Sequence, residues 1–359
     1  MAKTRVLIVE DSLTVRKYLA EVLGSDPDLE VIGEAEDGRR AIELCLALRP
    51  DVITLDMMLP IMSGVAVTEY VMAFCPVPIL VVSASTNRGE LYKTYDALAA
   101  GALDVLEKPT GDEHDAVWER SLLSAVKMAA RIKVITHIRA KIGSRATPSP
   151  HSSARVESHN GLKHSRIVAI GGSTGSPAAI VEILRGLPSD FPVPILLVIH
   201  ISRIFGGAFA EWLDAQSKLR VRYAKDGERL PTSGQPGVLM APPGFHLLVR
   251  GENLRLTFGP ERNSCRPSVD VLFESLAQVF GDQTTACLLT GMGRDGAAGL
   301  LALRRVGALT LAQDEASSVV FGMPKEAIQI GAASRVLALA DIASALVAAV
   351  HPADLRSQH

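Results

Sequence analysis

The chain has 359 residues, more than twice the roughly 150 of a typical domain, so we expect two domains. Hydrophobic residues make up 48% and charged residues 21%, a composition that can form packed cores and is too apolar for a disordered chain. The formal net charge of −2 and the aromatic content of 4% argue against a protein whose surface binds nucleic acid.

The sequence also predicts a cytoplasmic protein that does not insert into a membrane. The first residues do not form a signal peptide, and apolar runs such as Pro194–Ile201 are far shorter than the ~18 residues that span a bilayer. The cysteines form no Cys-x-x-Cys pair, and we interpret them as reduced thiols that mostly fill the core. There are four of them: Cys45, Cys75, Cys265 and Cys287.

One segment, residues 144–165, separates the chain into two parts. It is rich in Ser, Pro, His and Arg and has no sustained apolar period, which is typical of a flexible linker. The preceding stretch, Asp115–Ile142, carries apolar residues at helical spacing and predicts a long amphipathic helix. We therefore predict a first domain over residues 1–127, a helical extension and linker over 128–165, and a second domain over 166–350.

Both parts alternate short apolar strands with helices, a pattern that predicts parallel sheets covered on both faces. The stretch His246–Phe258 turns at Gly251 and predicts an antiparallel hairpin added to the second sheet. The fold class is α/β, with a five-stranded parallel sheet followed by a doubly wound, mostly parallel sheet. The predicted strands of the first part are Arg5–Val9, Val31–Ala35, Val52–Leu55, Ile79–Ser83 and Val105–Glu107, with helices such as Thr14–Leu23 and Arg39–Leu48 between them. Those of the second part are Arg166–Gly171, Val193–His200, Arg220–Ala224, Val238–Ala241, Thr285–Thr290 and Ala308–Ala312.

Charged and hydroxyl side chains follow the strands of the first part, at the edge where an open α/β sheet binds its ligands. Glu10 and Asp11 follow the first strand, and Asp56 follows the third. Converging carboxylates repel each other unless a hard cation lies among them, and Mg²⁺ suits such a site. A carboxylate beside that ion could accept a phosphoryl group held by Ser83 and Lys108, which end the fourth strand and follow the fifth.

Residues 3–127 resemble the receiver domain of two-component response regulators, a flavodoxin-like fold. The matching residues are Glu10-Asp11, Asp56 through Pro60 with Gly64, Ser83-Ala84 and Lys108-Pro109. The resemblance implies that Asp56 is the phosphoacceptor and that Glu10, Asp11, Asp56 and the Met58 carbonyl hold Mg²⁺. It differs at Val105, where receivers usually have an aromatic residue.

The first strand of the second part ends in a turn of small residues that would present the Ser173 hydroxyl at a helix N-terminus. A serine nucleophile needs a base, and His200 ends the next strand. Asp295 lies after a later strand and could orient the histidine. The spacing alone leaves a nucleotide-binding turn open, although neither a P-loop nor a Gly-x-Gly-x-x-Gly motif is present.

Residues 166–348 resemble the catalytic domain of the chemotaxis protein-glutamate methylesterases, the CheB family. The matching motifs are Ile170–Gly175, Arg266–Phe273, Leu289–Gly296, and Ala312–Glu315 through Val320–Ala327. The resemblance implies Ser173 as nucleophile, His200 as general base and acid, Asp295 as orienting carboxylate and the Met292 N–H as oxyanion donor. The start of the helix suggests the Thr174 N–H as a second donor. No metal or cofactor is expected in this domain.

Together the resemblances imply a phosphorylation-activated response regulator that hydrolyses glutamate γ-methyl esters on methyl-accepting receptors and releases methanol. A chemotaxis-type histidine kinase would be the phosphodonor, and the unphosphorylated receiver would cover the cleft near Ser173. Deamidation of receptor glutamines remains an open second reaction. The family's His-Met-Pro segment is replaced by His200-Ile201-Ser202. That change keeps one alternative open, a two-component regulator whose second domain binds a partner without catalysis.

Overall fold

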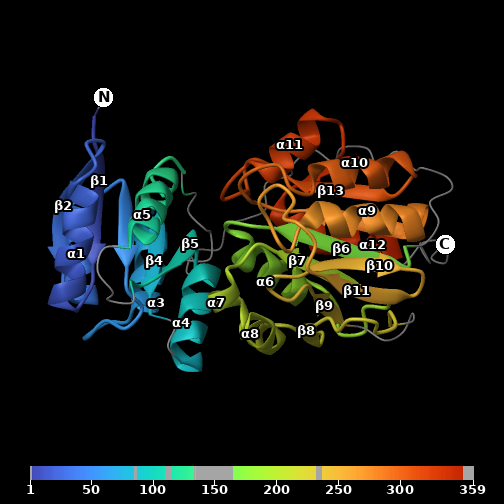
Figure 1. Cartoon of the computed structure of the whole chain (residues 1–359), viewed down its shortest axis with the longest axis horizontal. Helices are drawn as coiled ribbons and strands as arrows, with labels where there is room; N and C mark the ends of the chain where they lie inside the picture. The colour runs from blue at the N-terminus through green and yellow to red at the C-terminus, as the bar shows by residue number, and fades with distance from the viewer. Residues whose placement is uncertain are drawn as a thin grey trace, which may run out of the picture.

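The computed structural model describes residues 2–84, 87–109, 115–132, 134, 165–231 and 237–350. Within these residues the chain forms two α/β domains that lie side by side along the long axis of the molecule (Figure 1). No helix in the described part of the chain is long and apolar enough to cross a membrane. The predicted linker, residues 144–165, falls almost entirely outside the described residues.

The first domain is a five-stranded parallel sheet with helices on both faces, as predicted. Its strands lie in the order β2-β1-β3-β4-β5. One face packs against α1 and α5, and the other packs against α2, α3 and α4. The elements are β1 Thr4–Val9, α1 Leu13–Gly24, β2 Leu29–Ala35, α2 Gly38–Leu48, β3 Val52–Leu55, α3 Gly64–Phe74, β4 Ile79–Ser83, α4 Arg88–Ala99, β5 Asp104–Glu107 and α5 Ala116–Ala129.

Each helix of this domain begins at a residue whose side chain caps it. The capping oxygens accept hydrogen bonds from backbone N–H groups of the first turn, which would otherwise lack partners within the helix. The caps are Ser12, Asp37, Ser63, Asn87 and Asp115. Helix α5 ends at Ala129, and most of the rest of the amphipathic helix predicted over Asp115–Ile142 lies outside the described residues.

The second domain is built on a seven-stranded sheet in which every pair of neighbouring strands is parallel. The order is β14-β13-β12-β6-β7-β9-β8. The chain moves outward from β6 in both directions, so the carboxyl ends of β6 and β12 meet at a switch point in strand order. The elements are β6 Ile167–Gly172, α6 Ser176–Gly186, β7 Ile195–Ile199, α7 Arg203–Gly206, α8 Phe209–Gln216, β8 Val221–Tyr223, β9 Val238–Met240, β10 His246–Arg250, β11 Asn253–Thr257, α9 Val269–Val279, a 3-10 helix Gly281–Gln283, β12 Thr284–Leu288, α10 Ala297–Arg305, β13 Leu309–Gln313, α11 Met323–Gln329, β14 Arg335–Leu337 and α12 Leu339–Val350.

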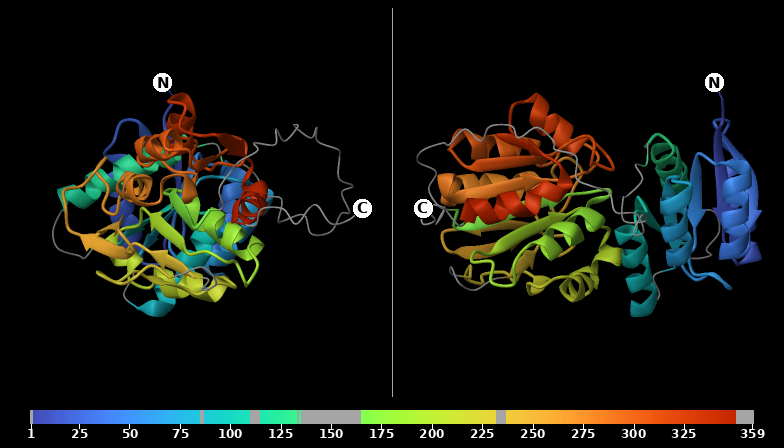
Figure 2. Two further views of the ribbon diagram at one scale, coloured as in Figure 1. Left: turned by 90° about the vertical axis from the view of Figure 1, so that its right-hand side faces the viewer. Right: turned by 180° about the vertical axis from the view of Figure 1, so that it is seen from behind.

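Two layers cover this sheet. Helices α6, α8 and α12 bury one face, and α9, α10 and the hairpin β10-β11 bury the other. Seen from behind, α6 in green and α12 in red lie in front of the strands (Figure 2). The predicted antiparallel hairpin is confirmed, but it does not join the main sheet. It forms its own two-stranded sheet and packs through Leu247, Val249 and Leu254 into the core beside α9.

The two domains meet through α4 of the first and α6 and α8 of the second. Tyr95 on α4 is fully buried and belongs to the core of the second domain. Its ring lies 5.2 Å from that of Phe209 and 5.5 Å from that of Trp212, and the Trp212 indole N–H donates to Asp96 at 2.8 Å. The salt bridge between Arg88 and Glu211, 3.4 Å long, lies at the exposed rim. The interface therefore has an aromatic core with a polar rim.

Candidate functional site

The first candidate site lies where β6 ends. Gly175 has a φ of 78° and precedes α6 without a side-chain cap. In the first turn the Ser176 N–H donates to the Ser173 carbonyl at 2.9 Å, and Pro177 has no N–H. Ser173 lies in this turn and is half-buried. Gly291 lies so close that a Cβ on it would be 2.8 Å from the Ser173 Cβ. These small residues let two strand ends meet around the serine hydroxyl.

His200 follows β7 and forms a buried pair with Asp295. The His200 Nε2 lies 2.9 Å from the Asp295 Oδ2, and the carboxylate is 2% exposed. Ser173 and His200 line the same pocket, and no hydrogen bond joins the two side chains within the described residues. Because Nε2 faces Asp295, the ring nitrogen left to accept the serine proton is Nδ1. In proteins without substrate, such catalytic hydrogen bonds are often long.

The Asp295 carboxylate is held by the loop that leads into α9. The Ser268 hydroxyl donates to its Oδ1 at 2.7 Å, and the Val269 N–H donates to its Oδ2 at 2.6 Å. Asn263 adds a third contact through its Nδ2 at 3.2 Å. The Arg266–Phe273 motif did not by itself indicate this supporting role. Only the folded chain shows that Ser268 faces a carboxylate distant in sequence.

His200 and Asp295 each shift the pKa of the other. Burial alone would lower the pKa of His200, but its hydrogen bonds with Asp295 and Cys265 outweigh burial and raise the pKa to about 9. Burial alone would raise the pKa of Asp295, and the hydrogen bonds from His200 and Ser268 bring it below its ordinary value. The arrangement stabilises an imidazolium beside a carboxylate, which is the charge state that forms when a histidine takes a proton.

Two backbone N–H groups near the serine lack acceptors. Neither Thr174 nor Met292 donates a backbone hydrogen bond to any described residue. Thr174 is in the turn before α6, and Met292 is 55% exposed in the turn after β12. Free donors on both sides of a nucleophile can stabilise an oxyanion, so both predicted donors remain available for that role.

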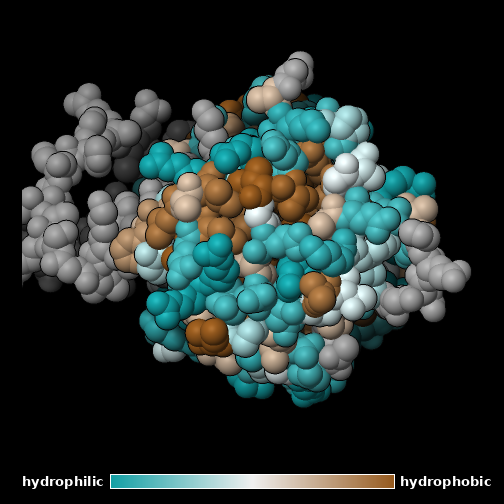
Figure 3. Space-filling model, turned by 90° about the vertical axis from the view of Figure 1, so that its left-hand side faces the viewer, coloured by the Kyte–Doolittle hydropathy of each residue, from teal (hydrophilic) through white to brown (hydrophobic). Residues whose placement is uncertain are grey.

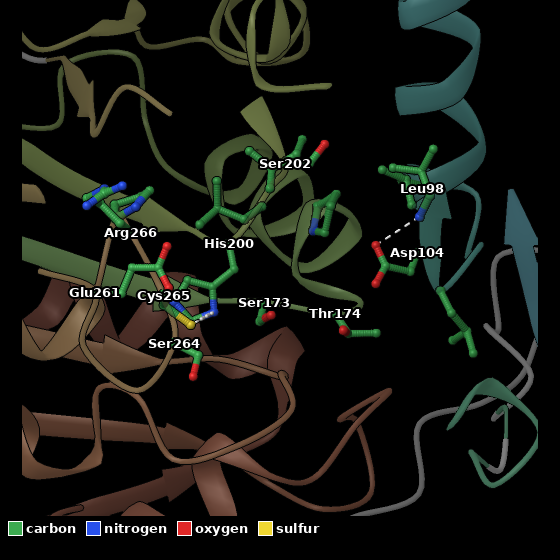
Figure 4. A pocket seen from close by; sticks show the side chains of 16 residues that line it. Leu98, Asp104, Ser173, Thr174, His200, Ser202, Glu261, Ser264, Cys265 and Arg266 are labelled. Atoms are coloured by element: carbon green, nitrogen blue, oxygen red, sulfur yellow. Dashed lines mark hydrogen bonds between the residues drawn. The ribbon is translucent and has the colours of Figure 1, made fainter. Parts of the chain in front are cut away.

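Both domains line the pocket around Ser173, which has a volume of about 370 Å³ (Figure 4). The second domain contributes Ser173, Thr174, Pro177, Ile199, His200, Ile201, Ser202, Glu261, Ser264, Cys265, Arg266 and Pro267, and the first contributes Leu98, Leu103, Asp104 and Val105. The first domain therefore forms a wall of the pocket that contains the serine. Ile201 and Ser202, which follow His200, also border this pocket.

A second candidate site lies at the carboxyl ends of the strands in the first domain. One oxygen from each of Glu10, Asp11 and Asp56 lies within 4.8 Å of the others. The Lys108 ammonium lies 2.9 Å from Glu10 and 3.0 Å from Asp56. The Ser83 hydroxyl is buried and accepts a long hydrogen bond, 3.4 Å, from Thr94. The structure thus brings all five of these predicted side chains to one sheet edge.

The acidic group in this site offers oxygen ligands to a cation. Burial raises the pKa of Glu10 to about 7, against the opposing effect of the hydrogen bond from Lys108. Its Oε2 is buried and accepts no well-aligned hydrogen bond within the described residues, although the Lys108 charge is close. An oxygen without a hydrogen bond beside two further carboxylates matches the oxygen ligands that Mg²⁺ prefers. Met58, whose carbonyl was predicted as a ligand, follows Asp56 in the adjoining loop.

The cysteines differ from the sequence-based interpretation at one position. All four are free thiols, and Cys45 and Cys287 are buried as expected. Cys265 instead lines the serine pocket, with its Sγ 3.6 Å from the Nδ1 of His200. It was missed because nothing in the local pattern places residue 265 near residue 200.

Comparison with known proteins gives matches to both domains. The family model described as CheB methylesterase matches residues 168–346, and the response regulator receiver domain model matches residues 6–115. The protein-glutamate methylesterase/protein-glutamine glutaminase of Nitrosospira multiformis is 45% identical and covers 95% of each chain. A protein of the same description in Geobacter metallireducens is 44% identical over 95% of this chain and 97% of its own. The crystal structure of the Thermotoga maritima CheB methylesterase catalytic domain is 37% identical, covering 51% of this chain and 97% of that one, with a TM-score of 0.49.

Proposed function

Because the chain belongs to the CheB methylesterase family and carries a receiver domain at its N-terminus, we propose that it hydrolyses glutamate γ-methyl esters on methyl-accepting chemotaxis receptors. The enzyme is then a carboxylic ester hydrolase controlled by phosphorylation. The observation that carries this proposal is a pocket lined by Ser173 and by His200, which pairs with Asp295, with residues of the receiver forming one of its walls.

In the proposed reaction, the Ser173 Oγ attacks the ester carbonyl carbon while the His200 Nδ1 accepts its proton. Asp295 orients the ring and stabilises the imidazolium, as its 2.9 Å contact with Nε2 supports. The tetrahedral oxyanion is held by the Met292 and Thr174 N–H groups. His200 returns the proton to the departing methoxide, methanol leaves, and water then hydrolyses the acyl-serine with His200 again as base.

The receiver is proposed to accept its phosphoryl group from a chemotaxis-type histidine kinase. The phosphoacceptor is Asp56, and Ser83 and Lys108 contact the phosphoryl oxygens. Glu10, Asp11, Asp56 and the Met58 carbonyl would hold Mg²⁺, which when bound neutralises charge on the transferred group. The end of the receiver that faces away from the second domain is mostly hydrophilic, with a larger hydrophobic patch and smaller separate hydrophobic spots (Figure 3). We propose that the kinase docks on this end.

Phosphorylation is proposed to act by moving the receiver off the pocket. In the arrangement described here, Asp104 and Val105 of β5 and Leu98 of α4 stand opposite the serine turn. Strand β5 leads directly to Lys108, which contacts Asp56. A change at Asp56 can therefore bias the position of β5 and α4, and shift the population toward an open form.

The same nucleophile could deamidate receptor glutamines, since an amide carbonyl offers the same electrophilic carbon and the names of the relatives include a glutaminase. In that reaction ammonia leaves in place of methanol. We propose it as a second activity of the same three residues. The alternative of a non-catalytic binding domain is not favoured, because the full-length relatives carry names of enzymes.

One assay tests both domains. Methanol release from methylated receptor is measured with and without a small phosphodonor, for the wild type, Ser173→Ala and Asp56→Asn. We expect release by the wild type that the phosphodonor increases, none by Ser173→Ala, and an unresponsive rate for Asp56→Asn. Release by Ser173→Ala would refute the assigned nucleophile, and a phosphodonor response in Asp56→Asn would refute the assigned phosphoacceptor.

A further inference from the structure

The thiol of Cys265 and the imidazole of His200 lie side by side in the serine pocket. Figure 4 shows the Cys265 sulfur directed at a ring nitrogen of His200, and the distance from Sγ to Nδ1 is 3.6 Å. Two ligands of one tetrahedral zinc ion, with Zn–S about 2.3 Å and Zn–N about 2.1 Å, lie about 3.6 Å apart. The pair therefore already has the separation that a shared ion requires.

The rest of His200 is arranged as in a metal ligand. A ligating histidine usually donates its second N–H to a carboxylate, which fixes the tautomer and leaves the other nitrogen free for the ion. Here Nε2 contacts the buried Asp295, so Nδ1 is the nitrogen that faces Cys265 and that would bind the ion in the neutral ring. His200, Cys265 and Asp295 each place one ligand atom within 4.8 Å of the others. Asp295 already accepts from Ser268 and Val269, which assigns it to orienting the ring rather than to binding the ion.

The loop that carries Cys265 is held in place before any ion binds. Arg262 and Cys265 exchange backbone hydrogen bonds of 3.1 and 2.9 Å. The Arg262 guanidinium binds both oxygens of Glu274 at 2.7 and 2.6 Å, and Asn263 contacts Asp270 and Asp295. Cys265 is only partly buried, and it lines a pocket large enough for water ligands to complete the coordination. Such preorganisation reduces the cost of binding.

We propose that Cys265 and His200 form a zinc site that blocks the serine pocket. The Sγ–H proton is released to solvent as the Sγ–Zn bond forms. Where His200 is charged, its Nδ1 proton is released as well, and Nδ1 then donates its lone pair to the same ion. A soft thiolate and an imidazole favour Zn²⁺ over Mg²⁺, so the two domains would select different cations. The expected effect on catalysis rests on the proposed function, because the ion occupies the nitrogen that would accept the Ser173 proton.

Cobalt(II) provides a test that does not depend on enzyme activity. Co²⁺ is titrated into the full chain with excess Mg²⁺ present to occupy the receiver carboxylates, and the near-ultraviolet thiolate-to-cobalt band is recorded. Cys45 and Cys75 form the only close pair of thiols in the described part of the chain, with sulfurs 3.5 Å apart, and they could also bind cobalt. Cys75→Ser, which removes one of these thiols, is therefore the matched control. We expect a band that saturates at one ion per chain in the wild type and in Cys75→Ser, and no band in Cys265→Ala.

Zinc affinity is then measured by competition with a coloured chelator. Loss of a direct ligand should weaken binding at least about tenfold in Cys265→Ala and Cys265→Ser, since changes to outer partners alone cost about 10–100-fold. Both Cys265 variants are measured, so that the test does not fail if one of them misfolds. A cobalt band that persists without Cys265, or that disappears only in Cys75→Ser, would overturn the site.

Methanol release completes the test. We expect buffered Zn²⁺ to inhibit the wild type, a chelator to restore its rate, and Cys265→Ala to keep its own zinc-free rate. Inhibition that is equal in Cys265→Ala would refute the role of Cys265. If the wild type releases no methanol even without zinc, the proposed function fails, and the cobalt band still decides whether the metal site exists.

Discussion

The phenol of Tyr95, on α4 of the receiver, donates a hydrogen bond of 2.5 Å to the backbone carbonyl of Phe205 in the second domain. Tyr95 is fully buried, and its ring packs edge-on against Phe209. One receiver side chain thus joins the core of the domain that it is proposed to inhibit. The free energy of this contact favours the closed arrangement, and any change that weakens it should favour opening.

Replacing Tyr95 by Phe should raise the activity measured without phosphodonor. The ring is kept, but the buried carbonyl of Phe205 loses its donor, at a cost of about 1–3 kcal/mol. If most of that cost falls on the closed form, the unphosphorylated rate rises by about 5- to 100-fold. Steady-state methanol release measures the change. Tyr18→Phe, which removes a hydrogen bond to Glu119 within the receiver, is the control and should leave the rate unaltered.

Replacing Asp295 by Asn should abolish most activity while the protein remains folded. An amide cannot stabilise the imidazolium and favours the wrong tautomer of His200, so we expect kcat to fall by about 10²–10⁴-fold. Single-turnover measurements with circular dichroism as a folding check test this. A variant within a factor of a few of the wild type would show that Asp295 does not orient the base.

Activity should depend on pH through His200. Only the neutral imidazole accepts a proton, and its pKa is raised to about 9, so kcat/KM should increase with pH and level off above about that value. Cys265 contributes to the upward shift, and Cys265→Ala should therefore move the midpoint to lower pH. The pH dependence of kcat/KM for both proteins measures this. Identical midpoints would mean that Cys265 does not influence the base.

Magnesium binding to the receiver should also depend on pH. Glu10 has a pKa raised by burial to about 7, so below that pH the cation must displace a proton from it. The apparent Kd for Mg²⁺ should therefore decrease as pH rises through about 7. Calorimetric titration of the full chain at several pH values tests this. Glu10→Gln should bind more weakly with a flatter profile, and the exposed Glu21→Gln should behave like the wild type.

The local sequence pattern was sufficient to predict the strands and the polar residues that follow them. An apolar run between two helical stretches has few alternatives to a buried parallel strand, so Val52–Leu55 and Ile79–Ser83 were predicted with the bounds observed. Asp56, Ser83 and Lys108 follow such strands directly. Their meeting at one edge follows from parallel pairing, and the same reasoning brought Ser173 and His200 to one pocket.

Three features could be seen only in the tertiary structure, because each depends on contacts between residues far apart in the chain. The hairpin of β10 and β11 forms a separate sheet, and its apolar side chains pack against α9. Ser268, Asn263 and Cys265 surround the His200–Asp295 pair because one loop folds back over two strand ends. The ring of Tyr95 packs into the hydrophobic core of the second domain, which begins about seventy residues later in the chain. The spacing of apolar residues around Tyr95 does not predict that contact. The length and composition indicate two domains with packed cores. The burial of Tyr95 in the second domain depends instead on how the surfaces of the two folded domains fit together.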